Sequence, residues 1–335
     1  MRQLELKKIG IQNLELVEAE APEPGPGEVL VRLDAASINP RDLQIMNGHF
    51  TPNLPLPLVP LSDGSGLVVA TGEGVTRVAA GERVNPLFFP NWISGEATAG
   101  ERSISLGLEA PGVARDYGVF PERAVCRSAA HLSAVQAACY PCAGLTAWTS
   151  LVDKSDIGEG DWVLIQGTGG VASMGLQFAR ALGARTIVIS SSDTKLQQAR
   201  SLGADHTINY RQTENWGAEA FEVSGHGVDA VLEIGGSGTL PQSLEAIRHG
   251  GHINIIGYMA GVDMGITVFP LIIKNANVHG IGTGNRDSFE AMMACVGANA
   301  IEPVIAQTFA MEAFAEAFAA LESSAPFGKI VLDQG

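Results

Sequence analysis

The clearest chemical pattern in this sequence is a glycine-rich turn, Gly167-Thr168-Gly169-Gly170-Val171-Ala172, which fits G-x-G-x-x-G/A. In this pattern Gly167 permits a tight turn, Gly169 lets the backbone approach a pyrophosphate, and Ala172 lets helix and strand pack closely. A helix that begins here offers free N–H groups and its positive dipole end to phosphates. The pattern predicts a dinucleotide site at Gly167, Gly169, Gly170 and Val171. A turn that only packs is the alternative.

The segments around this turn have the alternation that such a site needs. Residues 161–167 (DWVLIQG) form a short apolar run typical of a buried strand. Helical spacing then relates Val171, Met174, Gly175, Phe178, Ala179 and Leu182, and Gly183 is a suitable stop. Further strands are expected at 186–190, 206–209, 229–234 and 252–257, with helices between them, one of them at 194–202. Strand–helix alternation predicts an α/β fold with a doubly wound parallel sheet.

The two ends of the chain have a different texture. Residues 1–131 contain short β-like runs, such as 28–38 and 66–75, bounded by Gly and Pro. After about residue 280, a helix with Phe289, Met292, Met293 and Val296 on one face precedes a last strand at 329–333. These segments predict an irregular, β-rich second domain.

The end of the second strand indicates which dinucleotide binds. An acidic residue about 20 positions after the first glycine normally binds the 2′-hydroxyl of NAD. Here Ser190 lies 190 − 167 = 23 residues on, followed by Ser191, and no carboxylate stands there. Asp193, three residues later, is better placed to cap the following helix, for which Ser192 is the other candidate. Hydroxyl groups tolerate a 2′-phosphate, which predicts NADP(H) in preference to NAD(H).

Three nearby side chains could bind that phosphate by charge-assisted or polar hydrogen bonds: Lys195, Tyr210 and Arg211. Lys195 could equally be a solvated helix residue.

Composition excludes several classes of protein. The 335 residues carry 21 Lys+Arg and 36 Asp+Glu, a net charge of −15, so a nucleic-acid or anionic-membrane partner is not expected. Four cysteines are no disulfide framework, which favours a reducing compartment. No secretory signal and no membrane-spanning stretch are recognised. A cytoplasmic protein is expected.

The order of these motifs resembles the medium-chain dehydrogenase/reductase superfamily. The resemblance is carried by PEPGPGEVLVRL, SINPRDLQIMNG, PLVPLSDGSGLVVATGEGV, PCAGLTAW, VLIQGTGGVASMGLQFA, SLGADHTINYR and FGKIVL. It implies a doubly wound Rossmann domain at 131–281 and a GroES-like β-rich catalytic domain built from 1–130 and 282–335. It also implies a homodimer formed around Asn275–Gly280.

Within the superfamily, the sequence is similar to the zinc-independent quinone oxidoreductases and zinc-type alcohol-dehydrogenase-like proteins. Zinc enzymes have a Cys where this chain has Asn39, a His-Glu pair at Ser62-Asp63, and a third ligand at Cys142. Neutral Asn and Ser are poor zinc ligands, and no cysteine lies between Phe88 and Phe120, where the structural zinc lobe would be. Cys139 and Cys142 are expected to be buried and inert. No metal is expected.

The resemblance also assigns cofactor contacts. Thr146 would pack beside the nicotinamide ring, and Gly257, Tyr258 and residues 282–284 would hold its carboxamide. Gly235 and Gly236 would pass the adenosine, and Lys329 would contact the phosphates or the neighbouring ribose. Ordinary packing at strand ends is the alternative for each.

Hydride transfer without zinc requires hydrogen-bond donors for the negative charge on the acceptor oxygen. Candidate donors are Asn39, Arg41, Asn91, Trp92 and Tyr258. Asn39 is preferred because it stands at a vacated metal-ligand position, although an Asn before Pro40 could simply stabilise a turn. Arg41 could instead pair with Asp42. No proton donor is assigned.

These observations predict an NADPH-dependent oxidoreductase that transfers hydride to a small, activated carbonyl compound. That compound is expected to be a quinone or an α,β-unsaturated ketone. One alternative is a metal-free, NADP-dependent alcohol/aldehyde dehydrogenase. Another is a non-catalytic nucleotide-binding sensor whose cleft is blocked by Trp92 and Ile93. Trp92 and Ile93 belong to the segment 90–112, which is long and is expected to form a lid or pocket wall.

Overall fold

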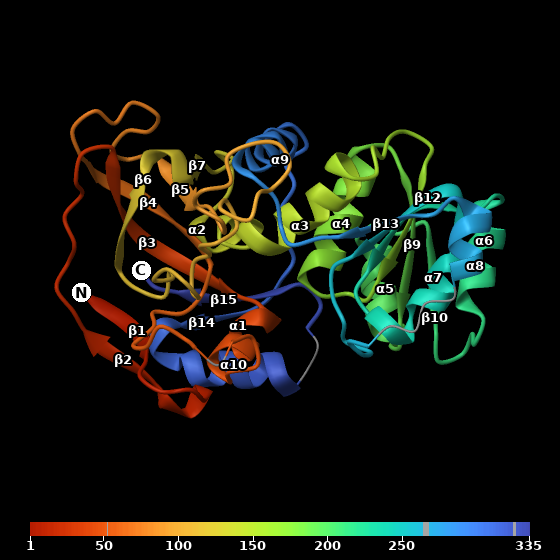
Figure 1. Cartoon of the computed structure of the whole chain (residues 1–335), viewed down its shortest axis with the longest axis horizontal. Helices are drawn as coiled ribbons and strands as arrows, with labels where there is room; N and C mark the ends of the chain where they lie inside the picture. Colours follow the sequence, from red (N-terminus) through yellow and green to blue (C-terminus); the bar gives the residue numbers. More distant parts are fainter. Residues whose placement is uncertain (52, 264–267, 324–325) are drawn as a thin grey trace. The chain divides into compact units, whose positions relative to one another are not determined.

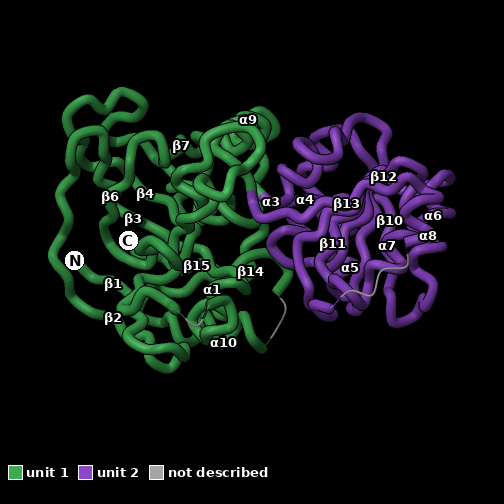
Figure 2. Tube along the Cα trace, viewed as in Figure 1, with its two compact units in different colours: residues 1–145, 284–335 green, residues 146–283 purple. Residues whose placement is uncertain are grey.

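The computed structural model describes residues 1–51, 53–263, 268–323 and 326–335. The chain divides into two compact units, coloured separately in Figure 2. Unit 1 consists of Met1–Leu145 and Gly284–Gly335, and unit 2 consists of Thr146–Thr283. The compact units therefore divide after Leu145 and Thr283, and the family resemblance implied domain boundaries after residues 130 and 281.

Unit 1 is built from strands contributed by both ends of the chain (Figure 1). Its strands are β1 (Arg2–Leu6), β2 (Leu14–Glu18), β3 (Glu28–Ile38), β4 (Asp63–Thr71), β5 (Arg83–Pro86), β6 (Tyr117–Pro121), β7 (Val125–Arg127), β14 (Ile305–Ala310) and β15 (Lys329–Asp333). Over the described residues, the main sheet has the order β14-β15-β3-β4-β5-β7, with β6 also paired to β3 and β1-β2 forming a separate pair. Strands β3 and β15 have the bounds that the sequence predicted.

Short helices connect these strands. They are α1 (Pro40–Met46), α2 (Ala134–Ala137), α9 (Arg286–Ala298) and α10 (Phe314–Ser323), with the 3₁₀ turns η1 (Ile11–Asn13), η2 (Glu122–Ala124) and η6 (Met311–Ala313) and the π-helical turn η3 (Tyr140–Gly144). The core of the unit is a cluster of buried apolar side chains that includes Val29, Val31 and Leu33 of β3 and Phe318 of α10.

Unit 2 has the predicted alternation. Its strands are β8 (Trp162–Gln166), β9 (Arg185–Ser190), β10 (His206–Asn209), β11 (Val228–Glu233), β12 (Ile247–Ile255) and β13 (Asn277–Gly280). Its helices are α3 (Leu145–Trp148, which begins in unit 1), α4 (Gly170–Ala181), α5 (Asp193–Ser201), α6 (Trp216–Ser224), α7 (Leu240–Ala246) and α8 (Val268–Lys274), with the turns η4 (Thr149–Asp153) and η5 (Gly236–Gly238).

The strands of unit 2 form a parallel sheet in the order β10-β9-β8-β11-β12-β13 within the described residues. Counted along the chain this is 3-2-1-4-5-6, the order of the doubly wound dinucleotide-binding fold. Strands β8 and β11 are apolar along most of their length because central parallel strands are buried on both faces. The predicted α/β fold is confirmed. The edge strand β13 was not predicted as a strand.

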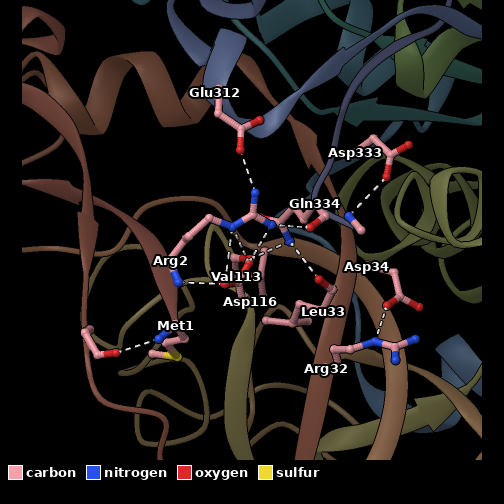
Figure 3. Close-up of polar contacts among 12 residues, drawn as sticks. Met1, Arg2, Arg32, Leu33, Asp34, Val113, Asp116, Glu312, Asp333 and Gln334 are labelled. Atoms are coloured by element: carbon pink, nitrogen blue, oxygen red, sulfur yellow. Dashed lines mark hydrogen bonds and ion pairs between the residues drawn. The ribbon is translucent and has the colours of Figure 1, made fainter.

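Arg2 ties the start of the chain into unit 1 (Figure 3). Its guanidinium forms ion pairs with Asp116 and Glu312 and donates to the carbonyl oxygen of Gln334. The Arg2 side chain is 42% exposed, so each ion pair contributes no more than about 1 kcal/mol. A polar cavity of about 300 Å³ adjoins this cluster, and the residues that line it include none of the candidate site residues. In the described residues, no helix is long and apolar enough to cross a membrane.

Candidate functional site

The predicted site residues divide between the two units. Asn39, Arg41 and Lys329 belong to unit 1. Unit 2 contains the others, which are Thr146, Gly167, Gly169, Gly170, Val171, Ser190, Ser191, Lys195, Tyr210, Gly235, Gly257 and Tyr258.

Asn39 lies in unit 1 at the start of helix α1. It is the N-cap residue, with Pro40 in the first turn, and its backbone N–H donates to Asp42 Oδ2 over 2.8 Å. The Asn39 side chain is only 5% exposed. The predicted turn-stabilising role is therefore real for the Asn39 backbone, whereas the side chain has a different partner.

That partner is Lys329, the first residue of β15. Because Ile330 is paired with Ile38 of β3, Lys329 lies beside the end of β3. Its Nζ donates to the Ile38 carbonyl oxygen at 2.8 Å and to Asn39 Oδ1 at 2.5 Å. Lysine has no acceptor, so the Asn39 amide must turn its oxygen toward Nζ. Asn39 Nδ2 is then a buried donor with no close hydrogen-bond partner among the described residues, and it faces the Asp63 carboxyl group, whose pKa it helps to lower.

Asp63 completes this buried polar cluster. It accepts hydrogen bonds from Ser62 Oγ at 2.8 Å and from the backbone N–H of Cys142 at 3.1 Å. Burial raises the pKa of Asp63, and the Lys329 ammonium and the nearby Asn39 amide oppose that rise. The cluster therefore holds a lysine cation and an acidic group close together in a nearly dry environment.

The two cysteines of the Cys139-x-x-Cys142 pair are poor nucleophiles in this environment. Burial is the main cause that raises the pKa of both thiols to about 12, and at Cys142 the Asp63 charge contributes to that rise. A thiol is reactive and ligates metals as its thiolate. In the described residues, no group of three or more His, Cys, Asp or Glu side chains could hold a metal ion.

Arg41 packs against aromatic rings, and its charge partly offsets the rise that burial causes in the pKa of Asp42. Its guanidinium carbon lies 4.3 Å from the centroid of the Phe88 ring, and Nη2 donates to Ser105 Oγ at 3.2 Å. Such a contact holds the segment after Phe88 against α1.

The segment 90–112 is also anchored by backbone hydrogen bonds. Trp92 packs on Phe88 and Phe89, and Cys142 adjoins this aromatic cluster. The carbonyl oxygens of Trp92 and Ile93 accept from the first turn of α9. An apolar aromatic surface therefore lies next to Cys142. Asn91, another candidate donor, accepts from Arg123.

The glycine-rich turn of unit 2, residues 167–172, is the predicted phosphate turn, and its geometry is open. Gly167 has φ +78°, a conformation that favours glycine, and Gly169 is the N-cap residue of α4. A Cβ atom at either position would meet no heavy atom within 4 Å. The first N–H groups of α4 therefore border open space, which fits a bound pyrophosphate.

The ends of β9 and β10 lie side by side, with Ser190 paired to Asn209. Ser192 caps α5, and the Asp193 carboxylate accepts from Asn209 Nδ2 and Gln212 Nε2. Asp193 was one of two candidate caps, and Ser192 performs that role. Tyr210 is 45% exposed next to this edge.

The loops after β11 and β12 interlock in unit 2. A Cβ atom on Gly257 would lie 2.8 Å from the Ile234 carbonyl oxygen, and one on Gly235 would lie 2.2 Å from Thr239 Oγ1. Both positions thus require glycine for packing. Tyr258 follows directly and is 47% exposed, whereas Thr146 is buried at the start of the unit.

Sequence reasoning missed two residues at this edge of the sheet, Gln166 and Glu233. Both side chains are buried at the ends of β8 and β11 and are hydrogen bonded to each other. The signal was present, since each is a polar residue that directly follows three apolar residues at the end of a strand.

Comparison with known proteins agrees with these features. Residues 25–134 match the alcohol dehydrogenase GroES-like domain, and residues 170–298 match the zinc-binding dehydrogenase family. A zinc-type alcohol dehydrogenase-like protein of Schizosaccharomyces pombe is 40% identical over 331 residues, covering 96% of both chains. The chain belongs to the medium-chain dehydrogenase/reductase superfamily, in its zinc-type alcohol-dehydrogenase-like group.

Solved structures of this superfamily have the same fold. A putative alcohol dehydrogenase from Sinorhizobium meliloti superposes with a TM-score of 0.94 at 39% identity, covering 99% of this chain and 98% of that one. A protein described as an NAD-dependent alcohol dehydrogenase superposes with a TM-score of 0.90 at 33% identity over the full length of both chains. This member of the superfamily is an NAD(P)-dependent oxidoreductase of the alcohol dehydrogenase type, with a GroES-like domain and a Rossmann-like sheet.

Proposed function

We propose that this protein is an NADPH-dependent reductase that transfers hydride to an activated carbonyl acceptor, a quinone or an α,β-unsaturated ketone, without a catalytic zinc ion. The observation that carries the proposal is the contact between Lys329 Nζ and Asn39 Oδ1, which leaves Asn39 Nδ2 as a buried donor.

The chemistry of the side chains at the superfamily's zinc-ligand positions supports a metal-free site. Asn39 Oδ1 is bound to an ammonium group, Ser62 donates to Asp63, and the Cys142 pKa is raised to about 12 by burial. A zinc ion would have to share this small buried volume with the Lys329 cation. The donor set does not fit a catalytic zinc, which normally has three protein ligands.

The residues of unit 1 provide what reduction of a carbonyl needs in the absence of a metal. A bound reduced nicotinamide supplies the hydride. As hydride reaches the acceptor, negative charge develops on the acceptor oxygen. Asn39 Nδ2 can donate a hydrogen bond to that oxygen, while Lys329 fixes the amide orientation and adds positive charge nearby. The buried aromatic cluster of Phe88, Phe89 and Trp92 adds apolar surroundings beside Cys142, which suit a quinone or enone better than a charged substrate.

The preference for NADPH is supported by the β9–β10 edge. Positions 190 and 191 are serines and carry no negative charge. The nearby Asp193 carboxylate already accepts hydrogen bonds from Asn209 and Gln212. The related structure described as NAD-dependent makes direct measurement of both coenzymes necessary.

The deciding experiment is a set of acceptor assays on metal-analysed protein. Quinones, enones, simple aldehydes and alcohols are each tested with NADPH/NADP⁺ and NADH/NAD⁺, before and after chelation. Reduction of quinones or enones that survives chelation supports the proposal. Activity confined to simple alcohols and aldehydes, activity lost on chelation, or coenzyme binding without turnover contradicts it.

The coenzyme preference is tested separately with Ser191→Asp. Ser191 is partly exposed, so the variant can fold without burying the new carboxylate. That carboxylate should repel the 2′-phosphate of NADPH. We expect the Kd for NADPH to rise at least tenfold, about 1.4 kcal/mol, with the Kd for NADH little changed. Calorimetric titration measures both. Ser201→Asp, at the far end of α5, is the control for added charge, and an equal loss of NADPH affinity there would contradict the assignment.

We also propose a homodimer formed through the edge of the unit 2 sheet. Within the described residues, strand β13 lies at the edge of the sheet and pairs only with β12. The neighbouring α8 exposes four large apolar side chains, 53–69% accessible: Val268, Phe269, Ile272 and Ile273. An apolar face of this kind next to a free strand edge suits a second copy of the chain.

A further inference from the structure

The most completely satisfied buried carboxylate in unit 2 is that of Glu233, which the reaction scheme does not use. Glu233 ends β11 and is 0% exposed. Its carboxylate accepts five hydrogen bonds: from Gln166 Nε2 (2.7 Å), Ser243 Oγ (2.5 Å), Thr239 Oγ1 (2.5 Å) and the backbone N–H groups of Gly235 (2.9 Å) and Gly236 (3.0 Å).

Gln166 is the second half of this arrangement. It is the last residue of β8 and directly precedes Gly167 of the phosphate turn. Its Nε2 faces Glu233, while its Oε1 accepts from the backbone N–H groups of Ile234 and Gly235, at 3.1 and 3.0 Å. A single side chain thus joins the strand that carries the phosphate turn to the loop after β11.

The same loop is bound to the loop after β12. Ala260 N donates to the Gly235 carbonyl oxygen at 2.7 Å, and Ile256 N donates to the Glu233 carbonyl oxygen at 2.8 Å. A Cβ atom on Gly236 would lie 2.6 Å from the Gly261 carbonyl oxygen, so the two loops have no room to slide. Glu233 therefore connects the segments that come after three neighbouring strands, β8, β11 and β12.

In a sheet of this order, ligands bind at the carboxyl ends of the strands. A buried polar network is costly unless every group is satisfied, and a satisfied one holds a single arrangement. Binding is tighter when the contacting loops are already ordered. The Glu233–Gln166 pair is a satisfied buried network at the carboxyl ends of the strands, and it orders the loop that follows β11.

We propose that Glu233 is a positioning residue for the dinucleotide: with Gln166 it locks the Gly235–Ser237 loop to the strand that carries the phosphate turn. This inference rests on the dinucleotide site proposed above. It assigns the pair to coenzyme affinity and not to the hydride-transfer step.

The first test is Glu233→Gln, which keeps the shape but replaces one acceptor oxygen with an NH₂ group that faces other donors. We expect the Kd for NADPH to rise about tenfold or more, with kcat at saturating coenzyme and substrate within about twofold of wild type. Amide hydrogen exchange at Gly235 and Gly236 in the ligand-free protein is expected to accelerate, and this readout is independent of activity.

The decisive test is the exchange of the two side chains. Gln166→Glu alone places two carboxylates together and should also weaken coenzyme binding. In the double variant Q166E/E233Q, the NH₂ group again faces a carboxylate, and the oxygens still accept from the same backbone N–H groups. We expect its Kd to return to within about threefold of wild type. Ser243→Ala, which removes one hydrogen bond to Glu233, is the milder variant should E233Q fail to fold, with an expected Kd rise of about threefold.

Asp229→Asn is the matched control, because Asp229 is a buried carboxylate at the opposite end of β11 that pairs with Arg248 and Trp162 N. It should lower thermal stability without changing the Kd. Unchanged Kd values in the folded Glu233, Gln166 and Ser243 variants, or no recovery in the double variant, would overturn the role of Glu233 alone. Wild-type protein that binds neither coenzyme would overturn the dinucleotide site and this role together.

Discussion

Lys329 and Asn39 show how one contact gives a neutral amide a direction. Asparagine can present either its oxygen or its NH₂ group, and an ammonium partner on the oxygen leaves only the donor side available. A donor that is already oriented and dry stabilises developing negative charge more effectively than one that must reorganise.

Asn39→Ala removes that donor. We expect kcat/KM for a quinone or enone acceptor to fall about 10²–10³-fold, the typical loss for one oxyanion donor, while the Kd for NADPH stays within about twofold. Steady-state kinetics and calorimetry measure the two quantities.

The control for Asn39→Ala is Asn47→Ala, because Asn47 is the C-cap residue of the same helix α1 and its side chain accepts from Ile11 N. If the Asn47 variant loses as much activity as the Asn39 variant, helix stability and not hydrogen bonding to substrate explains the result.

Asp42 should make folding stability depend on pH. Burial is the main cause that raises its pKa from 3.8 to about 6. The folded state therefore holds this proton more tightly than the unfolded state, and the contribution is full below pH 4 and lost as pH rises through about 6. Relative to Asp42→Asn, wild type should lose roughly 1–3 kcal/mol of unfolding free energy between pH 4 and pH 7. Urea denaturation at both pH values measures the difference, and parallel pH profiles would contradict the prediction.

At the scale of elements, the site of unit 2 depends on the loops at the strand ends more than on the strands themselves. The turn after β8 leaves open space at the start of α4, whereas the loops after β11 and β12 are packed in backbone-to-backbone contact. Glycine serves both needs, since it allows a positive φ at Gly167 and a close approach at Gly257.

Gly257→Ala tests the close approach. Its Cβ would lie 2.8 Å from the Ile234 carbonyl oxygen, so the two loops must separate. We expect a loss of about 1–3 kcal/mol in unfolding free energy and a weaker Kd for NADPH. Gly158→Ala, in a position with open space and no positive φ, is the control and should change neither. If Gly257→Ala has the wild-type unfolding free energy and the wild-type Kd for NADPH, the two loops can separate without cost and the prediction is wrong.

At the scale of the whole molecule, the proposed homodimer rests on the exposed apolar face of α8. Phe269 is 69% exposed and Ile272 is 66% exposed. Side chains of this size are normally covered when they lie together.

Phe269→Asp with Ile272→Asp should convert the proposed dimer to a monomer, because two carboxylates would be buried in the interface. Sedimentation velocity over a range of concentrations measures the assembly. Val69→Asp, an exposed apolar position on β4 in unit 1, is the control and should leave the assembly unchanged. A wild-type monomer, or a dimer that persists in the double variant, would contradict the proposal.

Local patterns in the sequence were sufficient to predict the α/β class, the glycine-rich turn between β8 and α4, and the bounds of several strands. Apolar runs, helical spacing and punctuating glycines act over a few residues, so β10 and β15 could be predicted with their observed bounds. The edge strand β13 and the π-helical turn η3 were missed, because neither has a distinctive pattern along the chain.

The sequence by itself determined that a glycine-rich turn lies between a strand and a helix, and its resemblance to zinc enzymes predicted that Asn39 stands at a vacated ligand position. Only the tertiary structure decided the partners: Lys329 is 290 residues from Asn39 along the chain, and Glu233 is 67 residues from Gln166. Hydrogen bonds between such distant side chains result from strand pairing and loop packing, and no local pattern records which buried polar groups will meet.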